Sequence, residues 1–486
     1  MLKRWLAMGL IVMAAGCETY TKLRHEPPVC PSKTIPPEPG TDPATLKDAT
    51  VIRPTSQPAA KMTLEACIRA ALDRNGRIRI ADRQILIAQD RVREAWAIDL
   101  PKLTAEGRFD IQEKNAGSAA FSAAAAAGQS SSVPKLDRDV ASTSMTLLVP
   151  VYNFGFGYHQ REAARLGVDV ASLSARRVEQ DLILDVKQSY FRVLEAQKIR
   201  DVVRDSILTV TRQLEVARDF YQQGLVAKND VLVVEVQLAE RNLQLIQADN
   251  NIQLAMATLD RLIGEPVTRD LLLDDILETA PWTGRFEEVF FLAVRERPDL
   301  AALRKQIRIV DEQYRSTRAT LAPRIDAYAN YSYSDSNNVS DHATFTGGLV
   351  ANWSIFDGGL TWAQLARLSK EINQAVDQQS EAEKDIILQV KQAYLNLTNA
   401  AKGIPVARKS IELAEENLRI TRDQYAQGLL ISEDVLLQEE RLAQARSSYY
   451  RALYAYHQSS AVLTNAVGTE LPAARGASHA QTQPVR

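Results

Sequence analysis

Residues that could carry catalytic or metal chemistry are few and scattered in this chain of 486 residues. The chain contains three cysteines and five histidines, but no CxxC or HExxH motif, whose ligand spacing suits zinc. It also contains no G-x-S-x-G motif, which would present a serine nucleophile on a sharp turn, so a hydrolase is disfavoured. The formal net charge of -2 gives no indication of a nucleic-acid partner. We therefore predict that the protein is not an enzyme and holds no metal or cofactor.

One cysteine stands in a setting that predicts a covalent modification. Two basic residues precede a short apolar segment that ends in "AAGC", with Cys17 as its last residue. This ending resembles the bacterial lipobox, in which the cysteine becomes the lipid-modified first residue, although Ala14 stands where leucine is usual. We predict a signal peptide over residues 1–16 and lipid attachment at Cys17; the alternative is an ordinary signal peptidase site nearby. An aspartate after the cysteine would, by the same resemblance, retain the protein at the inner membrane, so Glu18 favours the outer membrane.

The segment that follows the lipid site is rich in proline. Eight prolines lie between Pro27 and Pro54, so this stretch forms neither a helix nor a central strand. We interpret residues 17–61 as a lipid-anchored strap that leads to the folded body. Cys30 in the strap and Cys67 beyond it would both lie in an oxidising compartment, where they either form a disulfide or remain two free thiols.

The body of the chain is a tandem repeat. The phrase "YQQGLVAKNDVL" at Tyr221 returns 204 residues later as "YAQGLLISEDVL" at Tyr425, with seven of the twelve positions identical. The same offset relates "DLILDVKQSY" to "DIILQVKQAY". Self-similarity on this scale predicts two copies of one structural unit. We assign the first repeat to residues 62–269, an inter-repeat linker to 270–285, the second repeat to 286–469 and a flexible C-terminal tail to 470–486.

Each repeat combines helices with two short strands. Apolar residues recur at helical spacing over residues 62–100 and 286–321, which predicts a helix in each range. Apolar and polar residues then alternate strictly in four short segments, which predicts strands at about 102–112, 140–151, 324–334 and 345–356. Strands of about ten residues suit a tilted membrane strand, whereas a soluble sheet with one wet face is the alternative. Four strands alone would leave two open edges, which a bilayer forbids. Three copies of the chain would supply the twelve strands of a closed barrel.

Long helices explain the repeated phrase. Nothing interrupts a helix from about Phe156 to Gln222, and apolar residues from Ile207 to Tyr221 alternate in steps of three and four, which is typical of a coiled coil. Gly224 and Gly428 are expected to end the incoming helices, and Asn229 and Ser432 to cap the outgoing ones. Each phrase is therefore the tip of a helical hairpin. Only the second repeat carries an expected interruption of its long helix, at Gly403 and Pro405.

Together, the lipobox, the repeated architecture and the paired Y-x-x-G-L…D-V-L tips resemble the TolC-like outer-membrane efflux factors, in particular their OprM/NodT-like lipoprotein branch. The resemblance covers about residues 62–469. It implies a homotrimer with a twelve-stranded barrel in the outer membrane and a long α-helical tunnel across the periplasm. It further implies a periplasmic adaptor protein, an inner-membrane efflux pump, and passive export of small toxic compounds or proteins. The alternatives are the outer-membrane component of type I protein secretion, or a periplasmic coiled-coil scaffold without a barrel.

The resemblance also suggests roles for residues at the tips. Family members close the periplasmic mouth near the second tip with a tyrosine, an arginine and aspartates, and Tyr425 and Asp434 match this pattern. Leu430 and Leu437 stand at the arginine and second aspartate positions, so that ion-pair lock is not carried over. Three Asp434 carboxylates would form a ring, unless Asp434 only complements the helix dipole, as Asp230 would in the first repeat. The adaptor is expected to dock on both tips, around Gly224, Leu225, Gly428 and Leu429.

Overall fold

A computed structural model describes residues 61–111, 139–265, 272–275, 282, 284–335 and 343–470 of the chain. Residues 56–486 form one compact unit. The predicted signal peptide, the lipid site Cys17, the strap cysteine Cys30 and the tail after residue 470 lie outside the described residues.

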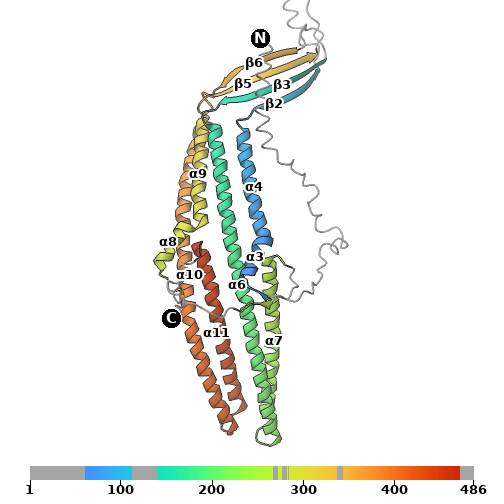
Figure 1. The fold of residues 1–486 in the computed structure, drawn as a ribbon, viewed down its shortest axis with the longest axis vertical. Coiled ribbons are helices and arrows are strands. Elements are labelled where there is room, and N and C mark those ends of the chain that lie inside the picture. Colours follow the sequence, from blue (N-terminus) through green and yellow to red (C-terminus); the bar gives the residue numbers. More distant parts are fainter. Residues whose placement is uncertain are drawn as a thin grey trace, which may run out of the picture. The chain divides into compact units, whose positions relative to one another are not determined.

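The two repeats contain the same set of helices (Figure 1). In the first repeat these are α3 (Leu64–Arg74), α4 (Gly76–Ala97), α6 (Phe156–Gln222) and α7 (Lys228–Ile263). In the second they are α8 (Phe286–Glu296), α9 (Pro298–Ala319), α10 (Leu360–Ala426) and α11 (Ser432–Val467). The four lengths, 11, 22, 67 and 36 residues, are identical in both repeats. The predicted span of the first long helix is confirmed.

Each of the two predicted helices before the strands is in fact two helices. The first breaks at Asn75, whose side-chain oxygen accepts a hydrogen bond from the Arg77 amide at 2.8 Å and so caps α4. The second breaks at Arg297, which adopts an extended conformation (φ -66°, ψ 123°) because Pro298 follows it. Pro298 then occupies the first turn of α9, where a missing amide proton costs nothing.

The expected interruption at Gly403 and Pro405 does not occur. Helix α10 continues from Leu360 to Ala426 with Pro405 inside it. A proline removes one helical hydrogen bond and crowds the preceding turn, but packing can hold the helix together. Here Leu397, Ala400 and Ile404 pack into a hydrophobic cluster with α8 and α11, which stabilises the helix up to the proline.

The four longer strands form one antiparallel sheet in the order β2-β3-β5-β6. Their bounds are β2 (Lys102–Ile111), β3 (Asp139–Tyr152), β5 (Arg324–Asp335) and β6 (Ala343–Asn352). The last strand ends four residues earlier than the predicted 356, so Trp353 and Ile355 follow it rather than belong to it. Strands β2 and β6 are the two edges, and the sheet is not closed within one chain.

The register sorts apolar and polar side chains onto opposite faces of this sheet. Across the four strands, Ala105 pairs with Met145, Met145 with Tyr331, and Tyr331 with Phe345. The neighbouring row, which points to the other face, joins Glu106, Ser144, Ser332 and Thr344. Met145, Tyr331 and Phe345 are 51%, 48% and 71% exposed. The predicted alternation is confirmed, and its apolar face is uncovered.

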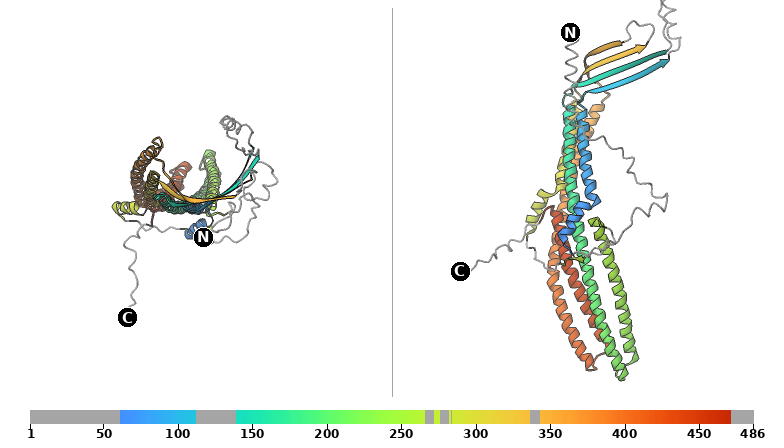
Figure 2. Two further views of the ribbon diagram at one scale, coloured as in Figure 1. Left: turned by 90° about the horizontal axis from the view of Figure 1, so that it is seen from above. Right: turned by 45° about the vertical axis from the view of Figure 1, so that its right-hand side comes forward.

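The sheet lies at one end of the helices and the hairpin turns lie at the other (Figure 1). Viewed along the helices, the sheet and the helical layer follow one curve that is open on one side (Figure 2). None of the helices in the described ranges has an apolar stretch long enough to cross a bilayer.

A small parallel pairing ties the linker to the first repeat. Strand β1 (Lys61–Met62) pairs with β4 (Leu272–Leu273), so the predicted linker contains a strand. The Tyr190 hydroxyl donates to the Asp274 carbonyl at 2.6 Å, beside the pair. Tyr190 also belongs to a buried cluster with Cys67, Leu182 and Tyr454. This cluster brings the start of the first repeat, its long helix and the last helix of the second repeat into one core.

Cys67 is a free thiol in this core and is fully buried. Burial, followed by the nearby Asp260 carboxylate, raises the pKa of the Cys67 thiol to about 11. Because the thiolate is the reactive form, we expect no maleimide or Ellman labelling of Cys67 in the folded protein at pH 8. With Cys17 blocked by the predicted lipid, denaturation without reductant should then release two reactive thiols, Cys30 and Cys67. Recovery of neither thiol without reductant, but both with it, would instead demonstrate a disulfide.

Candidate functional site at the two hairpin tips

Both hairpins turn through the same backbone motif. Helix α6 ends at Gln222 and Gly224 follows with φ 72°; helix α10 ends at Ala426 and Gly428 follows with φ 73°. In the first tip the Leu225 amide donates to the Phe220 carbonyl at 2.9 Å, and in the second the Leu429 amide donates to the Gln424 carbonyl at 3.0 Å. Each glycine amide donates to the carbonyl three residues earlier, so both turns are Schellman motifs.

The glycines are required by backbone conformation and not by lack of space. No atom lies within 4 Å of a Cβ built on Gly224 or Gly428. A side chain at either position would therefore meet no neighbour, and its cost would come from the left-handed backbone alone. The structure thus confirms the predicted turn chemistry at both tips.

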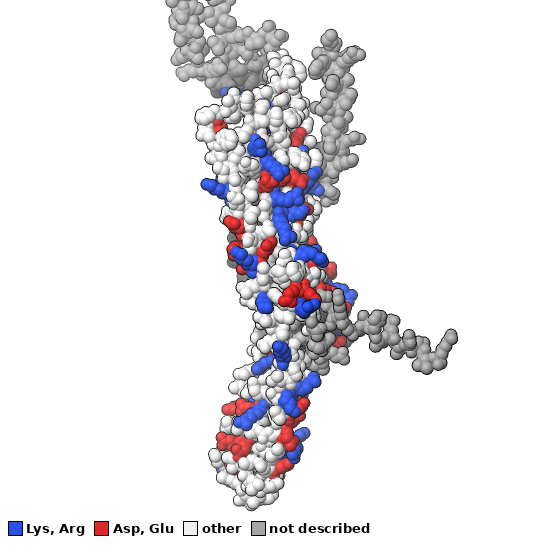
Figure 3. Space-filling view, turned by 90° about the vertical axis from the view of Figure 1, so that its left-hand side faces the viewer, with Lys and Arg blue, Asp and Glu red and all other residues white. Residues whose placement is uncertain are grey.

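The ends of the tips are apolar and open to solvent. Leu225 is 66% exposed and Leu429 is 69% exposed, directly after the two glycines. Ile431 adds a further side chain that is 53% exposed. On the face shown in Figure 3 the lower end is free of charged side chains, which gather just above it. The predicted docking surface around these leucines is therefore accessible in the single chain.

The outgoing helices start elsewhere than predicted. Ala227 and Ile431 occupy the N-cap positions, so the prediction of Asn229 and Ser432 as caps is wrong. Neither observed cap residue has a side-chain acceptor, and in the second tip Asp434 compensates from the first turn. Its carboxylate accepts a hydrogen bond from the Ile431 amide at 3.3 Å. This bond fits the interpretation of Asp434 as a group that stabilises the helix start.

The two tyrosines that open the repeated phrase have different surroundings. Tyr221 is 46% exposed, whereas Tyr425 is 5% exposed and its hydroxyl lies 3.0 Å from the Ser432 hydroxyl. The Tyr425 ring lies 5.7 Å from the ring of Phe220 on α6, so the first hairpin covers the second hairpin at this point. Leu436 of α11 in turn packs into a cluster of α6 and α7 residues. The tips are therefore joined to each other within one chain.

Near the tips, an arginine–glutamate ion pair crosses each hairpin, and the sequence analysis did not identify these pairs. Arg218 pairs with Glu235 at 2.7 Å across the first hairpin, and Arg422 pairs with Glu439 across the second. Arg218 and Arg422 are 204 residues apart, and so are Glu235 and Glu439. This repeated spacing is the sequence signal that could have identified the two ion pairs. Burial raises the pKa of Glu439, and Arg422 opposes this shift. The exposed Leu437 and the half-buried Leu430 contribute no charge to this arrangement.

Among the described residues there is no group of three or more His, Cys, Asp or Glu side chains that could hold a metal ion.

Comparisons with known proteins agree with this architecture. The sequence matches the family model "Outer membrane efflux protein" over residues 67–265 and 292–469. It is 24% identical over 341 residues to the alkaline protease secretion protein AprF of Pseudomonas aeruginosa, covering 66% of this chain and 69% of that protein. It is 21% identical over 420 residues to nodulation protein T of Rhizobium leguminosarum bv. trifolii, covering 84% and 85%. The fold is similar to that of the outer membrane protein VceC of Vibrio cholerae, with a TM-score of 0.70 at 17% identity, covering 84% of this chain and 96% of that one.

The contrast between the tyrosines provides a matched pair of variants. Tyr425→Phe should leave the buried Ser432 hydroxyl without its partner and destabilise the second tip by about 1 kcal/mol. We expect amides of residues 425–435 to exchange with deuterium about fivefold faster. Tyr221→Phe, at the equivalent exposed position, should leave exchange in the first tip unchanged. Equal effects of the two substitutions would show that the hydroxyl contact of Tyr425 contributes no stability.

Proposed function

The chain belongs to the outer membrane efflux protein family, and we propose that three copies form the outer-membrane channel of a tripartite efflux system. Membership of this family identifies an outer-membrane protein with a periplasmic helical part and excludes the enzyme alternatives. In the proposed assembly, substrates pass passively from an inner-membrane pump and a periplasmic adaptor to the exterior.

The open sheet is the observation that carries the proposal. Its apolar face, with Met145, Tyr331 and Phe345 uncovered, suits contact with lipid, and its polar face suits a water-filled interior. Edge strands β2 and β6 would leave backbone donors and acceptors unpaired in hydrocarbon, where each costs several kcal/mol. Pairing β2 of one copy with β6 of the next removes both edges, and three copies complete twelve strands.

The outer helices of the lower half support the same arrangement. Helices α10, α11, α6 and α7 stand side by side in that order, with α10 and α7 at the ends (Figure 1). Both end helices expose apolar side chains that a neighbouring copy would cover. On α7 these include Val236, Leu243 and Ile246, and on α10 they include Leu388, Leu395, Val406, Leu413 and Ile420.

The spacing on α10 favours a coiled coil with one change of phase. Leu388 and Leu395 are seven residues apart, as are Val406, Leu413 and Ile420, whereas Leu395 and Val406 are separated by eleven. An interval of eleven equals a heptad plus four residues, which locally unwinds the supercoil. Gly403 and Pro405 lie within this interval, so their position is consistent with the change of phase.

Three copies would present six tips to the adaptor, two from each chain. We assign docking to the exposed surface around Gly224, Leu225, Gly428 and Leu429. Tyr425 and Asp434 would lie at the periplasmic mouth, where Asp434 carboxylates from three copies would attract cations. Lipid attachment at Cys17 would add a second anchor besides the strands.

A second candidate function is the outer-membrane step of type I protein secretion. One relative of this chain is named a protease secretion protein, and its similarity covers 66% of the chain. Accumulation of a labelled small compound, or retention of a secreted protein, in cells that lack this chain would distinguish the two roles. The scaffold alternative has no support, because the chain belongs to a family of outer-membrane efflux proteins.

Assembly is tested on the purified protein in mild detergent. We expect the mass of a trimer and channel conductance in planar bilayers, because only closure satisfies the edge strands. Cys17→Ser should lose lipid labelling yet form the same conducting trimer, since the strands provide the membrane-spanning part. A monomer without conductance, or a Cys17→Ser protein that is released into the periplasm, would contradict the proposal.

Docking is tested at the tip glycines. Gly428→Val should strain the left-handed turn by roughly 1 kcal/mol or more, which is too little to unfold the long helices but displaces Leu429. We expect normal trimer abundance, failed export and reduced crosslinking to the adaptor, and the same for Gly224→Val.

Gly403→Ala is the matched control, because Gly403 lies inside α10, has no positive φ and has open space around its Cβ position. This substitution should leave both abundance and export intact. Low trimer abundance with normal export per trimer in Gly428→Val would show that the glycine only ends the helix.

A further inference from the structure

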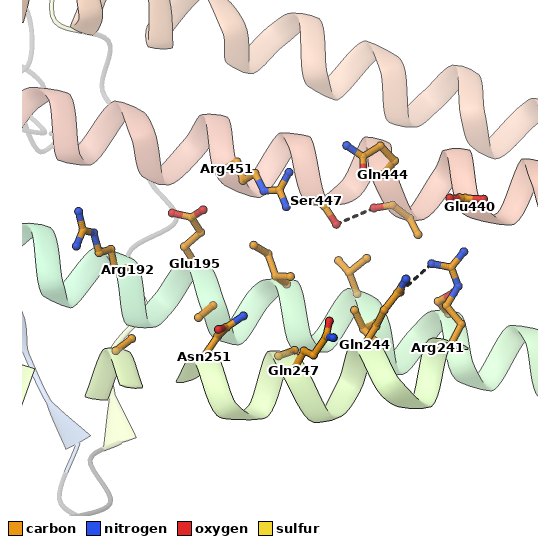
Figure 4. Close-up of a pocket in the computed structure, with 18 residues that line it drawn as sticks. Arg192, Glu195, Arg241, Gln244, Gln247, Asn251, Glu440, Gln444, Ser447 and Arg451 are labelled. Carbon is orange, nitrogen blue, oxygen red and sulfur yellow. Dashed lines mark hydrogen bonds between the residues drawn. The ribbon is translucent and has the colours of Figure 1, made fainter. Parts of the chain in front are cut away.

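A polar hollow lies between α6, α7 and α11, well above the tips. Its volume is about 630 Å³, within the range of small-molecule sites. Charged and amide side chains from all three helices converge on it (Figure 4). Three of them are arginines, one from each helix: Arg192, Arg241 and Arg451. Such a hollow is unusual in a coiled coil, whose helices normally meet through apolar side chains.

Arg241 carries the strongest indication of a missing partner. It is only 7% exposed, and its guanidinium donates to the Gln244 side-chain oxygen at 2.9 Å. When the side-chain amide of Gln237 is rotated so that its oxygen and nitrogen exchange places, the oxygen accepts a second hydrogen bond from the Arg241 guanidinium at 2.9 Å. Within the described part of the chain, none of the three arginines lies within 4.0 Å of a carboxylate, although Glu195 and Glu440 also line the hollow. The one carboxylate that acts on Arg241 is that of Glu439, which also interacts with Arg422 and Arg446. Positive charge is therefore in excess around Arg241, and because an incompletely compensated buried charge is costly, an anionic ligand would relieve it.

Ser206 is an independent indication. It lines the hollow, is 6% exposed, and its hydroxyl has no hydrogen-bond partner. The equivalent serine of the second repeat, Ser410, donates instead to the Val406 carbonyl at 3.1 Å, one helical turn back. The same residue type in the same kind of helix thus has its own partner in one repeat and none in the other. A buried hydroxyl without a partner is expected only where something else can satisfy it.

The charged residues that the first repeat contributes to the hollow have no charged counterparts in the second repeat. At the offset of 204 residues, Arg192 corresponds to Asn396, Glu195 to Asn399 and Arg241 to Ala445. The charged set is therefore no general requirement of this helical hairpin. Glu195 is already engaged, because its carboxylate is hydrogen-bonded to Gln458, and burial raises its pKa against the pull of Arg451 and Arg192. The charges that act on Glu195 are thus those of Arg451 and Arg192, not that of Arg241.

We propose that this hollow binds a small oxyanion, phosphate being the simplest probe, through Arg241, Arg451 and the Ser206 hydroxyl. Guanidinium groups favour oxyanions because their donors are planar and always charged. The bound anion would join α11 of the second hairpin to α6 and α7 of the first. The site lies within one chain, so it does not depend on the proposed channel function.

The test measures the melting temperature of the full-length protein in detergent at increasing concentrations of phosphate, sulfate or succinate. Chloride keeps the ionic strength constant. Phosphate and sulfate also stabilise proteins by exclusion from their surface, so saturation and the variants decide the result. We expect saturable stabilisation of the wild type. Arg241→Gln should weaken the apparent affinity about tenfold or more, because it removes a charged hydrogen-bond donor.

Two further variants make the result specific. Arg204→Gln, on the same helix as Ser206 but outside the hollow, should bind as the wild type does. Ser206→Ala should weaken binding several-fold without lowering stability in chloride, because its hydroxyl has no partner to lose. Equal responses of the wild type and Arg241→Gln, or no saturable effect of any of the three anions, would overturn the proposal. If a carboxylate from a neighbouring copy fills the hollow instead, none of the three anions should show a saturable effect.

Discussion

A sheet that enters a bilayer must pair every backbone donor and acceptor, because hydrocarbon offers no replacement for water. This constraint governs the rest of the molecule. The four strands of one chain leave the edges of β2 and β6 open, and their register places an apolar row on one uncovered face. A single copy is therefore incomplete in its proposed setting. The curvature of the sheet and helices, and the uncovered apolar residues of α7 and α10, are consistent with that incompleteness (Figure 2).

The tandem repeat gives an internal reference for deciding which residues carry special roles. Helices of identical length in the two halves show that the scaffold is preserved, so local differences stand out. Tyr221 is exposed where Tyr425 is buried, and Ser206 lacks a partner where Ser410 has one. A divergence of this kind is more informative than a residue type alone, because both copies experience the same helical context.

Most of the fold could be predicted, because long-range periodicity and turn glycines act locally. The span of α6, the alternating strands and the turns at Gly224 and Gly428 follow from such signals. Where prediction failed, a tertiary contact overrode a local preference. Ser432 is a good capping residue, but its hydroxyl is engaged by Tyr425. Pro405 is a helix breaker, yet packing beside Ile404 retains the helix. The hollow around Arg241 has no local signal, since its residues come from three helices.

The contacts that join the two hairpins have a magnitude that suits reversible movement. At the tips, the Phe220–Tyr425 ring contact between the two hairpins contributes about 1 kcal/mol beyond burial. Farther from the tips, the apolar contacts between the hairpins are interrupted by the polar hollow, where side-chain packing contributes less to the stability of their association. Shifting a two-state equilibrium from 1:99 to 99:1 takes about 5.5 kcal/mol of differential binding. In the proposed complex, adaptor contacts at Leu225 and Leu429, summed over several tips, would be of a kind that can supply this difference. Movement of this kind would be limited to the tip ends, because farther along the helices Tyr454 of α11 is buried in one core with α6.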